Sequence, residues 1–335
     1  MKDERGAARR AAARDAAPAL AVRGLTVTFA TRRGTLTAVD DVAFEIASGE
    51  VLGLVGESGA GKSLTGAAIL GLVDPPGRAA GEVWLDGRRI DALDREALRR
   101  VRGREVGAIF QDPLTALDPL FSIGDQIAET LRTHFRLSPA EARRDAIALL
   151  EDVGIPGAAA RYGQFPHQFS GGMRQRVVIA LALAGEPSLL IADEPTTALD
   201  VSIQAQIVTL LARLARERGM AILLVTHDMG VIASIADRIA VMYAGRIVES
   251  GRVADVIERP RHPYTAGLMA SIPSIADTRA RLAQIDGAMP RLTSIPAGCA
   301  FHPRCTVALE RCTRERPALI ADAAGASACW RVNAG

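Results

Sequence analysis

The sequence predicts an α/β fold with a wound, mostly parallel sheet, a helical insertion and an irregular C-terminal extension that contains cysteine. Three observations support this class. Apolar strands alternate with helices from residue 188 to 243, which is typical of a parallel sheet with crossover helices. A glycine-rich segment at residues 56–63 stands between a short apolar strand and a helix. All four cysteines lie in the last 37 residues, where prolines interrupt any regular period.

The composition of the 335 residues fits two domains, or one large domain with an appendage. Hydrophobic residues make up 49% and charged residues 23%, which excludes a wholly disordered chain. The net charge of +2 gives no general electrostatic footprint for nucleic acid. No apolar run reaches the ~18 residues of a membrane-spanning helix, so we expect the chain to be soluble or peripheral by itself. The basic residues include only two lysines, Lys2 and Lys62.

The N-terminal part of the chain is expected to form mainly strands. Residues 1–18 are rich in alanine and arginine and predict a disordered tail. Apolar residues then alternate or run together as they do in strands, at 20–30, 39–46, 51–55, 83–85 and 106–110. A helix is expected from about Lys62 to Leu72, because the Asp-Pro-Pro-Gly segment at 74–77 stops it.

The rest of the chain predicts more helix. Residues 124–153 predict an insertion of two helices, the second opened by Ser138 as N-cap, Pro139 and Glu141. The alternation then returns, with helices at 172–184, 201–218 and 228–235 and strands at 188–192, 221–226 and 238–243. After about residue 258 the pattern is irregular and rich in proline. We therefore predict a core domain at 19–258, with a helical subdomain at about 112–170, and an extension at 259–335.

The glycine-rich segment has the pattern of a phosphate-binding loop, G-x4-G-K-S/T. Its residues are Gly56, Glu57, Ser58, Gly59, Ala60, Gly61, Lys62 and Ser63. Glycines let successive N–H groups turn inward, and the N-terminus of the following helix adds free donors and positive potential. We expect Lys62 to meet the β- and γ-phosphates of a nucleotide and the Ser63 hydroxyl to ligate Mg²⁺.

Polar residues follow two of the later strands. Asp193 and Glu194 follow the apolar strand at 188–192. Two carboxylates at the end of a strand are a weak signal on their own. Beside a phosphate loop, however, Asp193 would hold Mg²⁺ through water. Glu194 would orient and deprotonate the attacking water. His227 follows the strand at 221–226. A lone histidine there is usually structural, but the carboxyl end of such a strand faces a nucleotide crevice, where an imidazole would sense the γ-phosphate.

A Ser-Gly-Gly segment, Ser170, Gly171 and Gly172, resembles the Leu-Ser-Gly-Gly-Gln signature of ABC-transporter ATPases, with Met173 in place of the usual Gln. Such a helix start offers N–H donors and a hydroxyl to a second γ-phosphate; an ordinary N-cap is the alternative. The resemblance covers about residues 20–258 and implies further site residues. Phe29 would stack on adenine, although a core phenylalanine is the alternative. Gln111 would lie beside Mg²⁺ and the lytic water. Asp200 would stand in a loop that reaches a partner subunit, and His227 would be the switch histidine.

The wording of the motifs narrows the resemblance to the ATPase subunits of oligopeptide, dipeptide or nickel importers. This narrower resemblance rests on residues 165–176, residues 56–59 and the His-Pro-Tyr-Thr segment at 262–265. The sequence departs from the subfamily at Asp118, which stands where the usual Leu-Asn-Pro motif has Asn. The resemblance implies that two ATPs join two subunits head to tail at the cytoplasmic face of a bacterial inner membrane. It implies two permease subunits, a solute-binding protein and, in preference to a homodimer, a paralogous ATPase partner.

Peptide import is the function that this resemblance favours, and import of nickel or another small solute is the alternative. A soluble ABC ATPase that acts on DNA or ribosomes is disfavoured, because those proteins usually carry a long coiled-coil insertion or tandem cores. The chain has one phosphate loop and a short insertion. An exporter half would require fused membrane helices, for which the sequence offers no apolar run.

The cysteines have the spacing C-x5-C-x6-C-x16-C, at Cys299, Cys305, Cys312 and Cys329. Zinc sites favour short C-x2–4-C pairs, which are absent. Four thiolates suit a 4Fe–4S cluster, and some importer ATPases of this group resemble this pattern and carry one. A four-cysteine zinc site and free thiols are the alternatives.

Overall fold

The computed structural model describes residues 17–32, 34–197, 199–272 and 284–333. Most of the tail predicted at 1–18 therefore lies outside the described residues. The described chain forms two compact units. Unit 1 consists of residues 17–20, 46–50 and 85–223, and unit 2 consists of residues 21–45, 51–84 and 224–333. Both units draw on the predicted core domain, and the predicted domain bounds stay predictions.

Unit 1 contains a pair of buried parallel strands. β6 (Val106–Ile109) runs beside β7 (Leu189–Asp193), with Val106 opposite Leu189 and Ile109 opposite Ala192. α8 (Gly171–Leu183) packs on β6, and α9 (Val201–Arg218) packs on α8. The two parallel strands thus end at the same edge, which is where polar residues of an α/β sheet gather.

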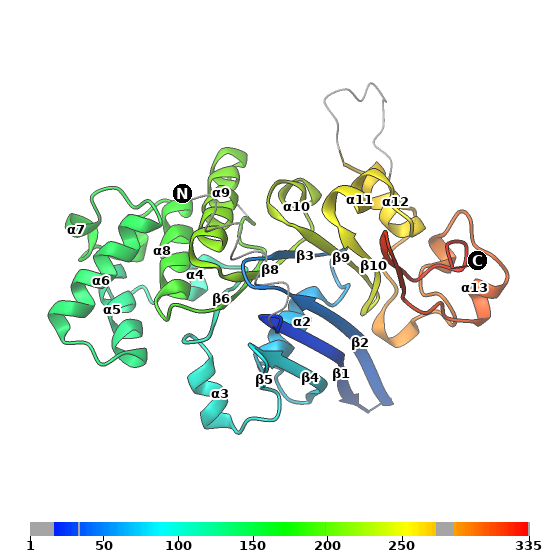
Figure 1. Ribbon diagram of the computed structural model, residues 1–335, viewed down its shortest axis with the longest axis horizontal. Helices are drawn as coiled ribbons and strands as arrows, with labels where there is room; N and C mark the ends of the chain where they lie inside the picture. The colour runs from blue at the N-terminus through cyan, green and yellow to red at the C-terminus, as the bar shows by residue number, and fades with distance from the viewer. Residues whose placement is uncertain (1–16, 33, 198, 273–283, 334–335) are drawn as a thin grey trace. The chain divides into compact units, whose positions relative to one another are not determined.

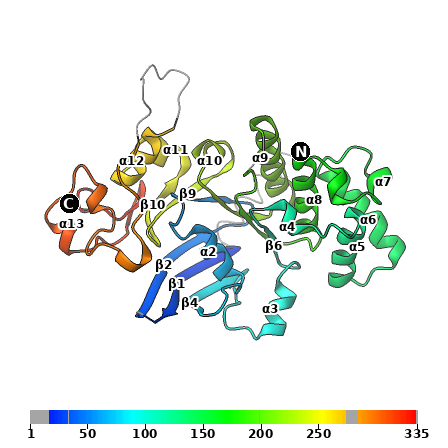
Figure 2. The same cartoon turned by 180° about the vertical axis from the view of Figure 1, so that it is seen from behind.

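The two helices predicted within residues 124–153 are present in unit 1. α5 (Ile123–His134), α6 (Pro139–Asp152) and α7 (Ala158–Arg161) gather beside α8, as Figures 1 and 2 show from opposite sides. The predicted cap of α6 is present, since Ser138 Oγ accepts the Glu141 N–H and the Glu141 carboxylate accepts the Ser138 N–H at 2.8 Å. The remaining short elements of the unit are β5 (Arg88–Arg89), α3 (Arg95–Val101), α4 (Pro113–Ala116) and η1 (Pro166–Gln168).

Unit 2 contains parallel and antiparallel strands in the order β11 (Ile320–Asp322), β12 (Gly325–Ser327), β10, β9 and β3. β3 (Val51–Val55) and β9 (Arg238–Tyr243) are parallel, as predicted. β10 (Arg246–Arg252) pairs antiparallel with β9 and was not predicted. Ala244 and Gly245 form the two-residue turn between them, with φ of +46° and +83°, which is the backbone of a tight hairpin. β8 (Ala221–Thr226) is divided between the two units after Leu223.

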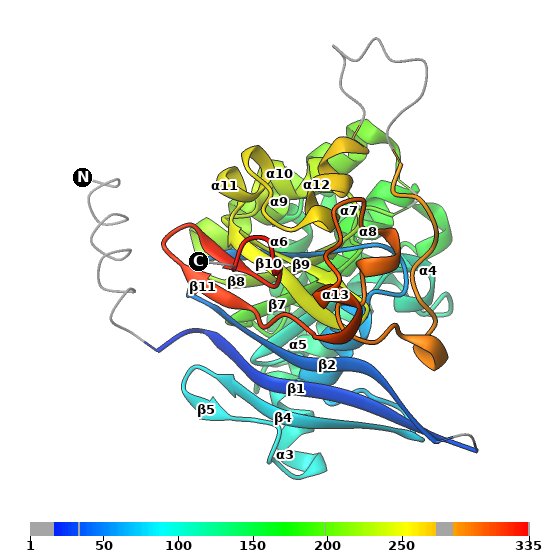
Figure 3. The ribbon, with the colours of Figure 1, turned by 90° about the vertical axis from the view of Figure 1, so that its right-hand side faces the viewer.

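A second sheet lies mainly in unit 2. β1 (Leu20–Thr31), β2 (Gly34–Ile46) and β4 (Gly77–Leu85) lie side by side in the order β2-β1-β4 (Figure 3). The helices of this unit up to residue 258 are α2 (Lys62–Ile69), α10 (Met229–Ile235) and α11 (Val253–Glu258). α2 is shorter than predicted, because Gly71 adopts φ +63° two residues after its end.

The prediction of an irregular extension after residue 258 is partly wrong. The segment contains α12 (Pro263–Ala270), η2 (Leu292–Ser294), η3 (His302–Arg304), α13 (Arg311–Arg314), β11 (Ile320–Asp322) and β12 (Gly325–Ser327). Pro263 begins α12 instead of interrupting it, because its fixed φ suits a first helical position. His262 caps this helix through Nδ1, which accepts the Tyr264 N–H at 3.1 Å. Burial lowers the pKa of His262 to about 4, so the ring is neutral near pH 7.

No helix among the described residues is long and apolar enough to cross a membrane.

Candidate nucleotide-binding site

The phosphate loop connects β3 to α2 and depends on its glycines. Gly59 and Gly61 have φ of +83° and +106°. A Cβ on Gly61 would lie 2.9 Å from Met242 Cε and 3.1 Å from the Ala38 carbonyl oxygen. Both the left-handed backbone and the close neighbours therefore require glycine at position 61.

Lys62 lies inside the curl of this loop. Its side chain is buried, and Nζ donates to the carbonyl oxygens of Gly56 at 2.8 Å and Glu57 at 3.1 Å. Ser63 follows in the first turn of α2 and is exposed. The loop thus sets an ammonium and a hydroxyl at the start of a helix, which is the arrangement that binds phosphate and its metal ion.

In unit 1 the structure brings Gln111 and Glu194 together. Gln111 follows β6 closely, Glu194 follows β7, and Gln111 Nε2 donates to Glu194 Oε2 at 3.2 Å. Thr197 Oγ1 donates to the same oxygen at 2.8 Å, a contact that sequence reasoning missed. Glu194 adopts φ +48°, which is uncommon for a residue with a Cβ and typical of functional positions. Asp193 is the last residue of β7.

The Ser-Gly-Gly segment forms the start of α8. Ser170 is exposed and is the N-cap, since its Oγ accepts the Met173 N–H at 3.4 Å. The N-cap alternative is therefore present in the structure, and an exposed hydroxyl at a helix start remains compatible with ligand binding. A Cβ on Gly172 would lie 2.5 Å from Ile203 Cγ2, so glycine allows α8 to approach α9 closely. Asp200 begins α9 as an exposed N-cap.

The other predicted ligand-facing residues lie in unit 2. Phe29 is half-buried on β1, and a Cβ on Gly77 would lie 2.8 Å from its ring. His227 is exposed and directly follows β8. The structure therefore groups Phe29, Lys62, Ser63 and His227 in unit 2 and Gln111, Ser170, Asp193, Glu194 and Asp200 in unit 1. Ala198, two residues before Asp200 in the sequence, lies outside the described residues.

The four cysteines of the extension are free and line one small cavity together with His262 and Trp330. Burial raises the pKa of the Cys299 and Cys305 thiols, and the charges of the neighbouring cysteines raise it further. Both thiols are therefore protonated near neutral pH unless a metal replaces the proton. Among the described residues, no three His, Cys, Asp or Glu side chains converge closely enough to hold a metal ion.

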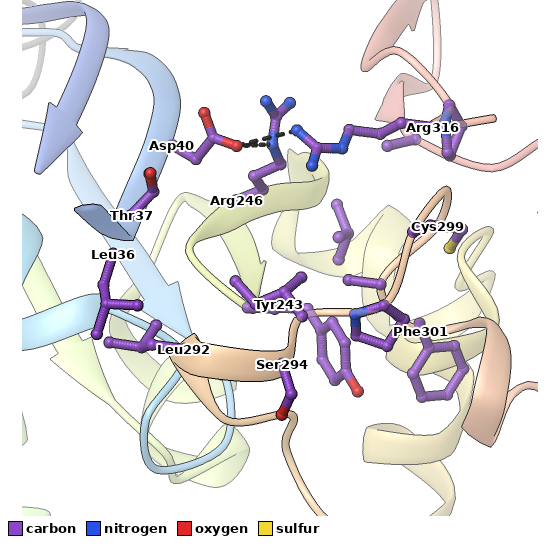
Figure 4. A pocket seen from close by; sticks show the side chains of 18 of the residues that line it. Leu36, Thr37, Asp40, Tyr243, Arg246, Leu292, Ser294, Cys299, Phe301 and Arg316 are labelled. Atoms are coloured by element: carbon purple, nitrogen blue, oxygen red, sulfur yellow. Dashed lines mark hydrogen bonds and ion pairs between the residues drawn. The ribbon is translucent and has the colours of Figure 1, made fainter. Parts of the chain in front are cut away.

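A larger cavity of about 580 Å³ lies in unit 2 (Figure 4). Asp40 on its wall accepts hydrogen bonds from Arg246 at 2.8 Å and Arg316 at 2.9 Å. Tyr243 and Phe301 also line it, and their rings meet edge to face at 5.2 Å between centroids. The extension is thus joined to β2 by the ion pair of Arg316 and to β9 by the packing of Phe301 on Tyr243, contacts that the sequence did not reveal.

Comparison with known protein families identifies two regions of the chain. Residues 39–197 match the ABC transporter family, and residues 248–312 match the C-terminal region of oligopeptide/dipeptide transporters. A putative peptide import ATP-binding protein of Brucella melitensis is 49% identical over 320 residues, which cover 90% of this chain and 93% of that protein. The oligopeptide transport ATP-binding protein OppD of Salmonella typhimurium is 48% identical over 298 residues, which cover 89% of each chain.

Solved structures agree with this assignment. The dimeric bacterial ABC transporter cassette MJ0796 has a TM-score of 0.63 and 31% identity, covering 70% of this chain and 98% of that one. Its dimeric post-hydrolysis form bound to ADP and Pi has the same TM-score, with 30% identity. The predicted α/β ATPase fold is therefore confirmed, and the chain belongs to the family of ATP-binding subunits of ABC transporters.

Proposed function

We propose that this chain hydrolyses ATP to energise an importer of dipeptides or oligopeptides across a bacterial cytoplasmic membrane. The observation that carries the proposal is the presence of both matched regions, the ABC transporter region and the oligopeptide/dipeptide C-terminal region, on one chain. The relatives named for peptide import match nearly its whole length. Nickel or another small solute is the alternative cargo, and the printed names of these relatives favour peptides.

The residues of the site divide the chemistry among them. Lys62 and the N–H groups of residues 58–63 bind the β- and γ-phosphates in this proposal. Ser63 and Asp193 would hold Mg²⁺, which would supply positive charge to the phosphates. Glu194 accepts the proton of the attacking water, and Gln111 and Thr197 fix its carboxylate. His227 contacts the γ-phosphate, and Phe29 stacks on adenine.

The signature segment acts on a second subunit in this proposal. Ser170 and Asp200 stand exposed at the starts of α8 and α9, where they are accessible to a neighbouring chain. ATP then favours a closed dimer, because only that state offers the nucleotide both sets of contacts. The relative MJ0796 was solved as a dimer. We expect the partner here to be a paralogous ATPase, bound with two permeases at the cytoplasmic face of the inner membrane and served by a solute-binding protein.

This proposal predicts that activity depends on assembly. The isolated chain is expected to hydrolyse ATP weakly and to gain at least about tenfold when it is reconstituted with a partner ATPase and permeases, because the partner's signature segment completes each site. Phosphate release at several protein concentrations would measure this. A monomer with full activity that does not vary with concentration would contradict the shared site.

The four cysteines support a second proposal, that they hold a 4Fe–4S cluster. The donor chemistry fits, since four free thiols line one cavity and thiolates are the usual ligands of such clusters. No step of ATP hydrolysis depends on the cluster.

Anaerobic purification is expected to yield brown protein with about four irons and four sulfides per chain. Loss of this absorbance in a Cys312→Ser variant, with ATP binding retained, would support the assignment. Zinc in place of iron, or folded and colourless protein without metal, would contradict it.

A further inference from the structure

We propose that Arg304 and Tyr264 of the C-terminal extension are positioning residues for the phosphate loop and that they act through Glu57. Glu57 is the second residue of the loop, and Arg304 and Tyr264 approach it from segments more than 200 positions away in the sequence. The inference rests on the proposed binding of ATP at this loop. It assigns the extension a role in that binding.

The carboxylate of Glu57 is held by Arg304. Arg304 Nη1 donates to Glu57 Oε2 at 2.9 Å, and Nη2 donates to Oε1 at 3.1 Å. The pair is bidentate, and only 7% of the Arg304 side chain is exposed. Such a planar pair fixes the orientation of both side chains as well as their separation.

The backbone of Glu57 is held as well. The Tyr264 hydroxyl oxygen accepts the Glu57 N–H at 2.8 Å, and Tyr264 is fully buried at the start of α12. Burial raises the pKa of Tyr264, so its hydroxyl is neutral at physiological pH. Because Lys62 Nζ donates to the Glu57 carbonyl oxygen, the N–H, C=O and carboxylate of Glu57 each have a partner, and the extension supplies two of the three.

The guanidinium of Arg304 also has partners outside the phosphate loop. Its Nε donates to the Asp286 carbonyl oxygen at 2.8 Å, and Nη1 also donates to the Tyr243 hydroxyl at 3.4 Å. The guanidinium carbon lies 5.8 Å from the ring centre of Tyr243 and 5.9 Å from that of Phe301. Rings and carbonyl oxygen restrict the guanidinium, so little freedom is lost when it pairs with Glu57.

This pair has an electrostatic consequence for ATP. A carboxylate in a loop that binds phosphates repels the ligand, and partial burial strengthens that repulsion. Arg304 neutralises Glu57 and also holds the first part of the loop in the curl that directs its N–H groups inward. Loss of Arg304 therefore leaves an unpaired negative charge in the anion site.

The test compares ATP affinity and turnover in full-length variants. Arg304→Ala is expected to weaken binding of a fluorescent ATP analogue about tenfold, which corresponds to about 1.4 kcal/mol, and to change kcat less than KM. Arg304→Lys should recover part of the affinity. The double variant Glu57→Gln/Arg304→Ala should recover most of it, because the unpaired charge is gone. Tyr264→Phe should show a smaller loss, since only the acceptor for the Glu57 N–H is removed.

Arg314→Ala is the matched control, because its side chain is 76% exposed and pairs only with Glu310 among the contacts described. ATP affinity of Arg304→Ala equal to that of wild type would overturn the inference, as would a double variant no better than Arg304→Ala. If Arg304→Ala does not fold, Arg304→Lys and Tyr264→Phe decide by the same measure. Wild-type protein that fails to bind ATP would instead overturn the proposed function.

Discussion

A Glu194→Gln variant is expected to bind ATP as wild type does and to lose turnover by a factor of about 100 or more, the usual contribution of a general base. The amide keeps the shape of the side chain but cannot accept the proton of the attacking water. Binding should persist because the proposed phosphate contacts come from residues 56–63, which the change leaves intact. Titration with a fluorescent ATP analogue and phosphate release by the assembled transporter would measure the two quantities separately.

The surroundings of Glu194 sharpen this expectation. Gln111 and Thr197 both donate to Oε2 of Glu194, so the carboxylate is oriented before water arrives. A Glu186→Gln variant is the matched control, because Glu186 is an exposed glutamate. It lies before the first residue of β7, whereas Asp193 is the last residue of that strand. Hydrolysis retained in Glu194→Gln would show that another group supplies the base. Loss in the control as well would show that the effect arises from folding.

The sequence predicted those parts of the site that local pattern determines. The phosphate loop needs eight consecutive residues with a strand before and a helix after, and all of this can be read along the chain. Predicting the contact between Gln111 and Glu194 requires one further inference. It follows from β6 and β7 being parallel neighbours, because the carboxyl ends of such strands meet at one edge.

Contacts between distant residues, and the conformation of single turn residues, could not be predicted in the same way. The bond from Arg304 to Glu57 joins residues 247 positions apart, and nothing in the spacing of either residue indicates it. The helix that begins at Pro263 was not predicted, because a proline alone does not distinguish a first helical position from an interruption. The hairpin of β9 and β10 was missed because Ala244 adopts φ +46°, a conformation that alanine does not signal.

A Lys62→Arg variant is expected to lose about 10- to 100-fold in ATP affinity although it keeps the positive charge. The loss corresponds to one charge-assisted hydrogen bond, about 1.5–3 kcal/mol. Lys62 is 5% exposed, and its Nζ lies within 3.1 Å of two carbonyl oxygens of the loop. A compact ammonium fits there, whereas a planar guanidinium is wider and its donors are fixed in a fork. Equilibrium titration with a fluorescent ATP analogue measures the change.

Lys62→Met and Arg314→Ala complete this experiment. Lys62→Met removes the charge and should bind ATP more weakly than Lys62→Arg, while Arg314→Ala should match wild type. The composition makes the comparison informative: 38 of the 40 basic residues are arginine, and the one lysine among the described residues stands in the phosphate loop. Equal affinity of Lys62→Arg and wild type would show that charge alone is required at this position, and that the size and shape of the ammonium do not matter there.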